Sequence, residues 1–297
     1  MVRVARPGVS RRAVIAGLAS AGLLAACGDE SEPAAFQVPQ GSGRVEFLVP
    51  AFPDGFGAPS MLVAGREQRA AFVVRDDIDV LRERAPAELG LTVSVDGVVV
   101  ASQALQRRTE GIITPYYPLV FTPERPGQYV AAVDGADPVP FLVVDEAEVP
   151  LVQVGDPMRP VDTPTLDDGR GVAPICTRAV PCPFHDVSLR EALGGGRPTV
   201  LLVSTPGFCQ TDICGPVVDL LIDAAGDRTD LVAVHAEVYV DPSEFSEGGF
   251  PATTETVDTY GLPFEPQLVV ADSSGKVVAR LDITWDRGEL SDALDRV

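Results

Sequence analysis

Lysine, histidine and tryptophan are scarce in this sequence of 297 residues. It has two histidines, one tryptophan and 23 basic residues against 43 acidic ones, for a formal net charge of −20. A surface with so few cations repels phosphate backbones and anionic headgroups. We therefore exclude nucleic acid as a partner, and we expect no membrane attachment through protein charge.

Long hydrophobic runs are also missing. The apolar run nearest the N-terminus, residues 13–26, is too short to span a bilayer. It follows a basic region that contains four arginines and no acid, which is typical of an export signal. The arginines are Arg3, Arg6, Arg11 and Arg12. The pair Arg11-Arg12 after Ser10 is compatible with either general or twin-arginine export.

The run ends at Leu24-Ala25-Ala26-Cys27, which resembles a bacterial lipobox. In such signals the peptide is cut before the cysteine, which then carries lipid. We expect residues 1–26 to be a signal peptide and Cys27 to anchor the protein by lipid on the extracytoplasmic face of the cell membrane. Residues 27–43 are polar and predict a tether.

Residues 44–145 lack a cysteine pair, a cluster of metal ligands, and a nucleophile with a neighbouring base. Short apolar segments separated by turns predict β-strands, and Asp96-Gly97 predicts a tight hairpin. The expected strands are 44–49, 68–75, 91–95, 98–104, 119–121, 128–133 and 139–144. Their number and spacing predict an immunoglobulin-like β-sandwich. Residues 146–172, rich in proline and aspartate, predict a linker to a second, α/β domain at 173–297.

The second domain is organised around residues 199–225. A continuous apolar run predicts a strand buried on both faces, and Val217, Leu220 and Leu221 recur at helical spacing. Cys209 and Cys214 lie in the turn between strand and helix, where a helix N-terminus lowers the pKa of a thiol. The arrangement indicates a redox site.

Residues 183–297 resemble the thioredoxin-like superfamily. Phe208-Cys209 stands where that family has an aromatic residue and its first cysteine, and Cys214-Gly215-Pro216-Val217 looks like its C-G-P-C with valine last. The spacing is C-x4-C instead of C-x2-C. The resemblance implies that Cys209 and Cys214 form the active disulfide and that Pro266 is a cis-proline that faces them. Thioredoxins often bury an acid six residues before the first cysteine, where this chain has Val203, so Glu237 is a candidate replacement.

A second cysteine pair, Cys176 and Cys182, lies in a loop rich in proline. For this pair we favour a structural disulfide, with a redox relay to Cys209 and Cys214 and metal binding as alternatives. His185 completes a C-x5-C-x2-H pattern, but zinc sites usually space their first two cysteines more closely.

These features predict a lipid-anchored thiol-disulfide oxidoreductase that acts on exported proteins and needs no cofactor and no metal. Cys209 would attack a partner's disulfide and Cys214 would resolve the mixed disulfide. One alternative is copper delivery, because the cysteine pair resembles that of Sco-type copper chaperones, with His235 as the distant histidine. Another is a binding lipoprotein with structural disulfides only.

Overall fold

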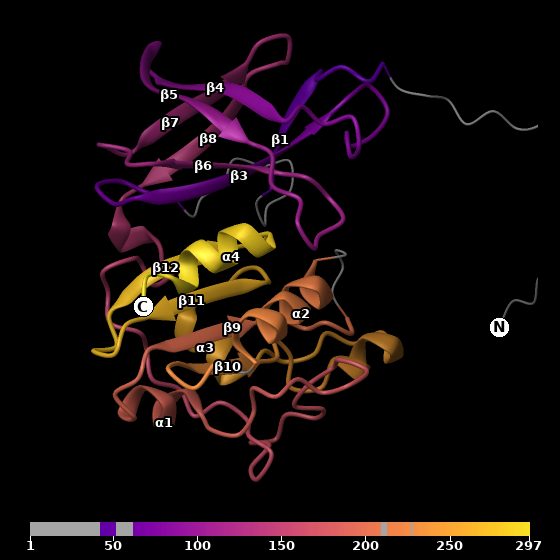
Figure 1. Cartoon of the computed structure of the whole chain (residues 1–297), viewed down its shortest axis with the longest axis vertical. Coiled ribbons are helices and arrows are strands. Elements are labelled where there is room, and N and C mark those ends of the chain that lie inside the picture. The colour runs from indigo at the N-terminus through magenta and orange to yellow at the C-terminus, as the bar shows by residue number, and fades with distance from the viewer. Residues whose placement is uncertain (1–41, 52–61, 209–212, 227) are drawn as a thin grey trace, which may run out of the picture. The chain divides into compact units, whose positions relative to one another are not determined.

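The computed structural model describes residues 42–51, 62–208, 213–226 and 228–297. Residues Pro39–Val297 belong to one compact unit. Within the described residues the strands form three sheets: two in the N-terminal part and one in the C-terminal part (Figure 1). In the part of the chain that is described, no helix is both long and apolar enough to cross a bilayer.

The N-terminal part is a β-sandwich whose strands lie close to the predicted segments. One sheet has the order β1 (Phe47–Pro50), β3 (Gln68–Arg75), β6 (Tyr117–Phe121). The other has the order β2 (Leu62–Val63), β8 (Val139–Val144), β7 (Gly127–Val133), β4 (Glu88–Val95), β5 (Val98–Gln106).

The two sheets bury one core between them. Phe72 and Tyr117 from the first sheet pack with Leu91, Tyr129 and Phe141 from the second. Alternate residues of each strand point inward because side chains along a strand point to opposite faces. The chain is therefore β-structured here as predicted, and the immunoglobulin-like assignment of the sandwich stays a prediction.

The predicted hairpin at Asp96-Gly97 joins β4 to β5, which pair antiparallel with Val95 opposite Val98. Asp96 has φ 51° and Gly97 has φ 77°. Positive φ at both central residues is what a type I′ turn requires, and aspartate followed by glycine tolerates it best.

The segment predicted as a linker packs along the C-terminal part. After a short 3₁₀ helix, Glu146–Glu148, its apolar residues enter a core with the α/β sheet. The Gly155 N–H donates to the Val277 carbonyl, and the Val277 N–H donates to the Asp156 carbonyl, both at 2.8 Å.

The C-terminal part has a four-stranded sheet in the order β10 (Val232–Ala236), β9 (Thr199–Val203), β11 (Gln267–Ala271), β12 (Val277–Asp282). β9 and β10 are parallel, and β11 runs antiparallel to both β9 and β12. Every residue of β9 and β11 is buried, as in strands covered by helices on both faces.

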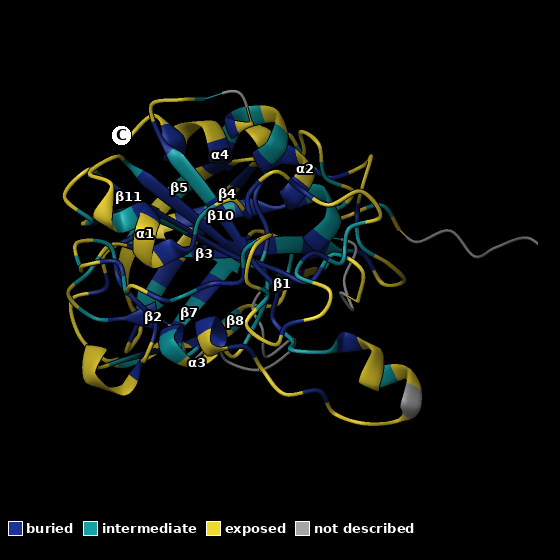
Figure 2. Ribbon diagram, turned by 90° about the horizontal axis from the view of Figure 1, so that it is seen from below, coloured by how far each residue is buried: buried dark blue, intermediate teal, exposed yellow. Residues whose placement is uncertain are grey.

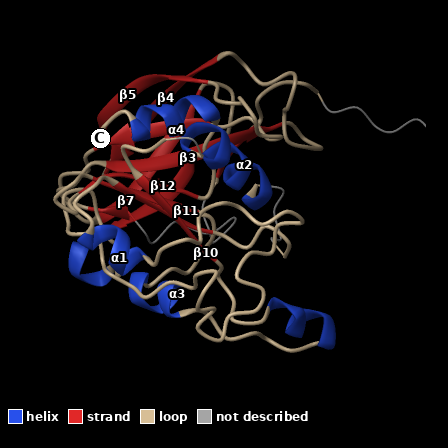
Figure 3. Ribbon diagram, turned by 60° about the horizontal axis from the view of Figure 1, so that its bottom comes forward, coloured by secondary structure: helices blue, strands red, loops and turns tan. Residues whose placement is uncertain are grey.

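Helices cover the two faces of this sheet in pairs (Figure 3). On one face α1 (Leu189–Gly194) and α3 (Glu255–Tyr260) share a core with Leu201 and Val203 of β9. On the other, α2 (Cys214–Ala225) and α4 (Arg287–Leu294) share a core with Val200 and Leu202. A further 3₁₀ helix spans Pro242–Glu247. Figure 2 shows these strands as a buried centre.

Two strands of this sheet end near the candidate site. β9 ends at Val203 and β10 ends at Ala236. Two residues after each strand end, the backbone N–H donates to a side chain instead of to a neighbouring strand. The Thr205 N–H donates to the Glu265 carboxylate, and the Val238 N–H donates to the Thr205 hydroxyl. The strands stop where the candidate site begins.

A buried polar cluster joins the sandwich to α4. Arg69 of β3 donates to both carboxylate oxygens of Glu289, at 2.5 and 2.7 Å, and to the carbonyls of Asp282 and Thr284. The Tyr116 hydroxyl donates to Glu289 and accepts the Asp286 N–H at 2.9 Å. The charges are paired inside the contact, as buried charges must be.

Candidate functional site

Cys214 is the first residue of α2, and it is fully buried. It is disulfide-bonded in the structure. Cys209 lies outside the described residues, as does Cys27, so the predicted pairing of Cys209 with Cys214 stays a prediction. Ile213 is at the N-cap position of this helix. Cys214 therefore sits in the positive field of the helix N-terminus, which favours a thiolate when the bond is open.

Glu265 is the carboxylate next to this cysteine. Its Oε2 atom lies 3.6 Å from the Cys214 sulfur and accepts the Thr205 N–H at 2.5 Å. Burial raises the pKa of Glu265 to about 7, because it disfavours the charged form more than the Thr205 hydrogen bond favours it. The Glu265–Pro266 peptide bond is cis, at the position that the family resemblance indicates. The site therefore has a carboxyl group that can exchange a proton near neutral pH.

Glu237, the predicted substitute for the missing acid, follows β10 and is buried. It accepts the Thr177 N–H at 2.6 Å and the Thr177 hydroxyl at 3.2 Å. Burial raises the pKa of Glu237 as well. Among the described residues its hydrogen bonds lead to the 173–186 loop, whereas Glu265 contacts the sulfur. The sequence signal for Glu265 was its place directly before the predicted cis-proline.

The predicted disulfide between Cys176 and Cys182 is absent: both are free and buried. Instead the Cys182 sulfur lies 3.3 Å from His185 Nε2 and 3.4 Å from His235 Nδ1, and those two nitrogens are 3.3 Å apart. The Cys182 N–H points at the Cys176 sulfur at 3.4 Å. We call these four side chains the Cys2His2 cluster. The ligand atoms of both thiols and both rings lie within 4.8 Å of one another.

The tertiary fold brings together His185 and His235, which are 50 positions apart in the sequence. The 173–186 loop runs beside the outer edge of the sheet, where the His235 N–H of β10 donates to the Phe184 carbonyl at 3.1 Å. His235 is in register with Leu202, so it points to the face of the sheet that α2 covers. The copper-chaperone alternative paired His235 with Cys209 and Cys214, but its ring faces Cys182.

The two thiols of this cluster have pKa values that shift in opposite directions. The Cys182 thiol is the main cause that lowers the pKa of Cys176, and the His185 and His235 rings lower it further. Burial opposes the shift. The same coupling, together with burial, raises the pKa of Cys182. Cys176 is thus the residue of the pair that holds thiolate more readily.

Thr177 connects the cluster to the loop that carries Cys209. Its hydroxyl accepts the Gly207 N–H at 2.9 Å, two residues before Cys209. The contact is close: a Cβ on Gly207 would lie 2.8 Å from the Thr177 carbonyl oxygen, so only glycine fits. Beside this contact is an open hollow of about 480 Å³, lined by Thr177, Arg178, Ala179, Val180, Pro206, Gly207, Gly215 and Asp219.

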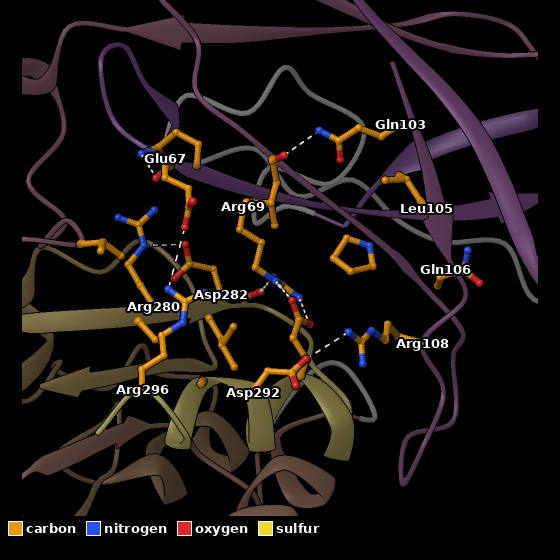
Figure 4. A pocket seen from close by; sticks show the side chains of 18 of the residues that line it. Glu67, Arg69, Gln103, Leu105, Gln106, Arg108, Arg280, Asp282, Asp292 and Arg296 are labelled. Atoms are coloured by element: carbon orange, nitrogen blue, oxygen red, sulfur yellow. Dashed lines mark hydrogen bonds and ion pairs between the residues drawn. The ribbon is translucent and has the colours of Figure 1, made fainter. Parts of the chain in front are cut away.

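A separate cavity of about 330 Å³ lies where the sandwich meets the α/β part (Figure 4). Arg69, Asp282, Arg280 and Glu67 line it, with Arg108 and Asp292 on the side near α4. Neither Cys214 nor Glu265 is among its lining residues. Its charges pair with one another, so we interpret it as the seam between the two parts.

Comparisons with known proteins find a distant likeness among solved structures. No protein-family model matches the chain, and no curated protein matches it. Among solved structures, one described as the C-terminal domain of a thiol-disulfide oxidoreductase from Bacteroides thetaiotaomicron is similar over 49% of this chain and 98% of its own, with a TM-score of 0.33 and 7% identity. A likeness this distant bears on no activity of this chain.

Proposed function

We propose that this chain is a thioredoxin-like thiol-disulfide oxidoreductase, with Cys209 and Cys214 as its exchanging pair. The observation that carries the proposal is the carboxyl of Glu265, 3.6 Å from the Cys214 sulfur at the start of α2. The buried strand β9 and the helix α2 precede it in the chain, and the strand β11 begins directly after the cis-proline. A redox-inert disulfide has no need of a half-buried acid with a pKa of about 7 beside it.

The reaction has two exchange steps. The Cys209 thiolate attacks one sulfur of a partner's disulfide, and the partner's other sulfur leaves as a thiolate. Cys214 then passes its proton to the Glu265 carboxylate and attacks the Cys209 sulfur. The bond between Cys209 and the partner breaks, and the departing partner thiolate takes up a proton. The partner's disulfide is reduced and the pair Cys209 and Cys214 is oxidised; the reverse sequence oxidises a partner.

The cellular setting belongs to the same proposal. The basic residues and apolar run before Cys27 support export and lipid attachment on the extracytoplasmic face of the cell membrane. Partners would then be exported proteins with thiols or disulfides. The hollow beside Gly207 and Gly215 is where such a partner would approach the cysteine loop.

Trapping a mixed disulfide tests the activity. In Cys214→Ser the second step is blocked, so we expect acid-quenched cells to hold a covalent adduct between Cys209 and a partner that a reductant releases. The double variant Cys209→Ser, Cys214→Ser should form none. If no adduct forms, and Cys209→Ser only lowers the melting temperature, the bond is structural and the binding-lipoprotein alternative holds.

A further inference from the structure

The Cys2His2 cluster has the donor set of a metal centre. Cys176, Cys182, His185 and His235 each direct one ligand atom inward, and these four atoms all lie within 4.8 Å of one another. The chain has only two histidines, and both are here. All four residues are buried, with at most 6% of any of them exposed.

The spacing of the ligand atoms matches tetrahedral coordination. With Zn–N bonds of about 2.0 Å and Zn–S bonds of about 2.3 Å, a tetrahedral site has N···N edges of about 3.3 Å and N···S edges of about 3.6 Å. The structure has 3.3 Å between the two ring nitrogens and 3.3 and 3.4 Å between Cys182 and each of them. For these three ligands only a small outward shift of the Cys182 sulfur separates the packing from the edges of a zinc-centred tetrahedron, and the Cys176 sulfur lies within 4.8 Å of each of them.

The histidine rings are oriented as ligands. His235 directs Nε2 at the Ser204 carbonyl oxygen, 3.0 Å away. A carbonyl can only accept, so Nε2 carries the hydrogen and Nδ1 presents its lone pair to the sulfurs. A backbone carbonyl that fixes the tautomer in this way is the usual outer partner of a metal-bound histidine. Among the described residues His185 Nδ1 has no hydrogen-bond partner although it is buried, and its Nε2 faces the cluster.

We propose that Cys176, Cys182, His185 and His235 bind one zinc-class divalent cation in a closed, four-coordinate structural site. Two thiolates and two neutral imidazoles select zinc among the common divalent metals. Two thiolate charges would neutralise the ion, which lowers the cost of burying it. No ligand position remains for substrate, which is typical of a structural site. The ion would fasten the 173–186 loop to β10, and this inference stands whether or not the cysteine pair at 209 and 214 is redox-active.

The test measures metal in the full-length protein. Zinc is determined by elemental analysis after purification with zinc present and without chelators, and Co²⁺ is then substituted for it. We expect one zinc per chain, and a Co²⁺ spectrum with sulfur-to-metal charge transfer and the intense visible bands of tetrahedral coordination. Cys182→Ser and His235→Ala should each lose the metal. Cys214→Ser, which alters a cysteine of the same domain outside the cluster, should keep it.

A measurement on the unaltered protein guards against variants that fail to fold. With zinc bound, alkylation of Cys176 and Cys182 should be slow, and a strong chelator should speed it at least tenfold. Peptide mapping that joins Cys176 to Cys182 in zinc-free exported protein would overturn the proposal. Metal content unchanged in His235→Ala, or Co²⁺ bands typical of octahedral oxygen ligation, would overturn it too.

Discussion

At the scale of single residues, the proposed chemistry depends on where one carboxyl group sits. Glu237 is buried and Glu265 is half-buried, and of the two only Glu265 lies at the Cys214 sulfur, 3.6 Å away. Glu237 is held by two donors from Thr177. In the proposed reaction the two acids therefore have different roles. Glu265 exchanges a proton with Cys214, whereas Glu237 binds Thr177 of the 173–186 loop.

Replacing Glu265 with glutamine should remove the inflection near pH 7 from the pH profile of the resolving step. A carboxyl with a pKa of about 7 accepts the Cys214 proton only when ionised, so the rate should rise as pH increases through 7 and level off above it. Glu265→Gln keeps an oxygen that can accept the Thr205 N–H but cannot take the proton. We expect a rate lower by about 10²-fold at neutral pH that rises steadily between pH 6 and 8 with the thiolate fraction of Cys214 and has no inflection near 7, measured by stopped-flow reduction of a model disulfide.

Glu237→Gln is the matched control, because it alters a buried acid of the same domain. Its pH profile should keep the inflection near 7. Equal profiles for unaltered protein and Glu265→Gln would exclude Glu265 as the proton acceptor.

At the scale of elements, the 173–186 loop is the segment whose contacts the sequence predicted least well. It combines Cys176 and Cys182 with Thr177, and it lies against both β10 and the loop before Cys209. The predicted bridge would have fastened this loop only to itself. The observed contacts fasten it to the sheet instead.

Thr177→Val should loosen the cysteine loop without a change in side-chain shape. It removes the acceptor for the Gly207 N–H and one donor to Glu237. Leaving buried polar groups unpaired costs about 1–3 kcal/mol. We expect a lower free energy of unfolding by that amount in urea titrations, together with slower thiol exchange. Thr122→Val, at an exposed threonine, should change neither. If the destabilised Thr177→Val protein exchanged thiols at the normal rate, the contact between Thr177 and Gly207 would not be needed for the activity.

At the scale of the whole molecule, the sandwich and the α/β part are joined by buried charge. Arg69 and Glu289 are about one-tenth exposed, and Tyr116 completes the cluster. Burial alone would raise the pKa of Glu289, but the charge and hydrogen bonds of Arg69 outweigh it and hold that pKa below its usual value. The pair stabilises the fold while Glu289 is ionised, and this contribution is lost as pH falls through its lowered folded pKa.

Arg69→Met should leave Glu289 buried without its partner. Removing one member of a buried ion pair costs about 3–5 kcal/mol. We expect a lower melting temperature, a separate transition for each part in calorimetry, and a smaller deficit at acid pH, where Glu289 is neutral. Arg125→Met breaks the exposed pair with Asp96 and should have little effect. A single unshifted transition in Arg69→Met would show that apolar packing alone joins the two parts.

Local sequence determined the elements of this protein. Alternating and continuous apolar runs predicted the strands of the sandwich and of the α/β sheet, and Asp96-Gly97 predicted its hairpin because few residues tolerate positive φ twice in succession. The strand, cysteine loop and helix around Cys214 followed from the same short-range signals.

Only the tertiary structure determined which residues lie next to each other in the Cys2His2 cluster and around Cys214. His185 and His235 are 50 residues apart and become neighbours because the 173–186 loop lies along β10. Glu265 reaches Cys214, 51 residues away, because β11 lies beside β9. Periodicity reports which face of an element is buried, but a pairing between distant elements depends on the whole packing. The sequence therefore supplied the ligands and the acid, and the packing of loop and sheet determined their partners.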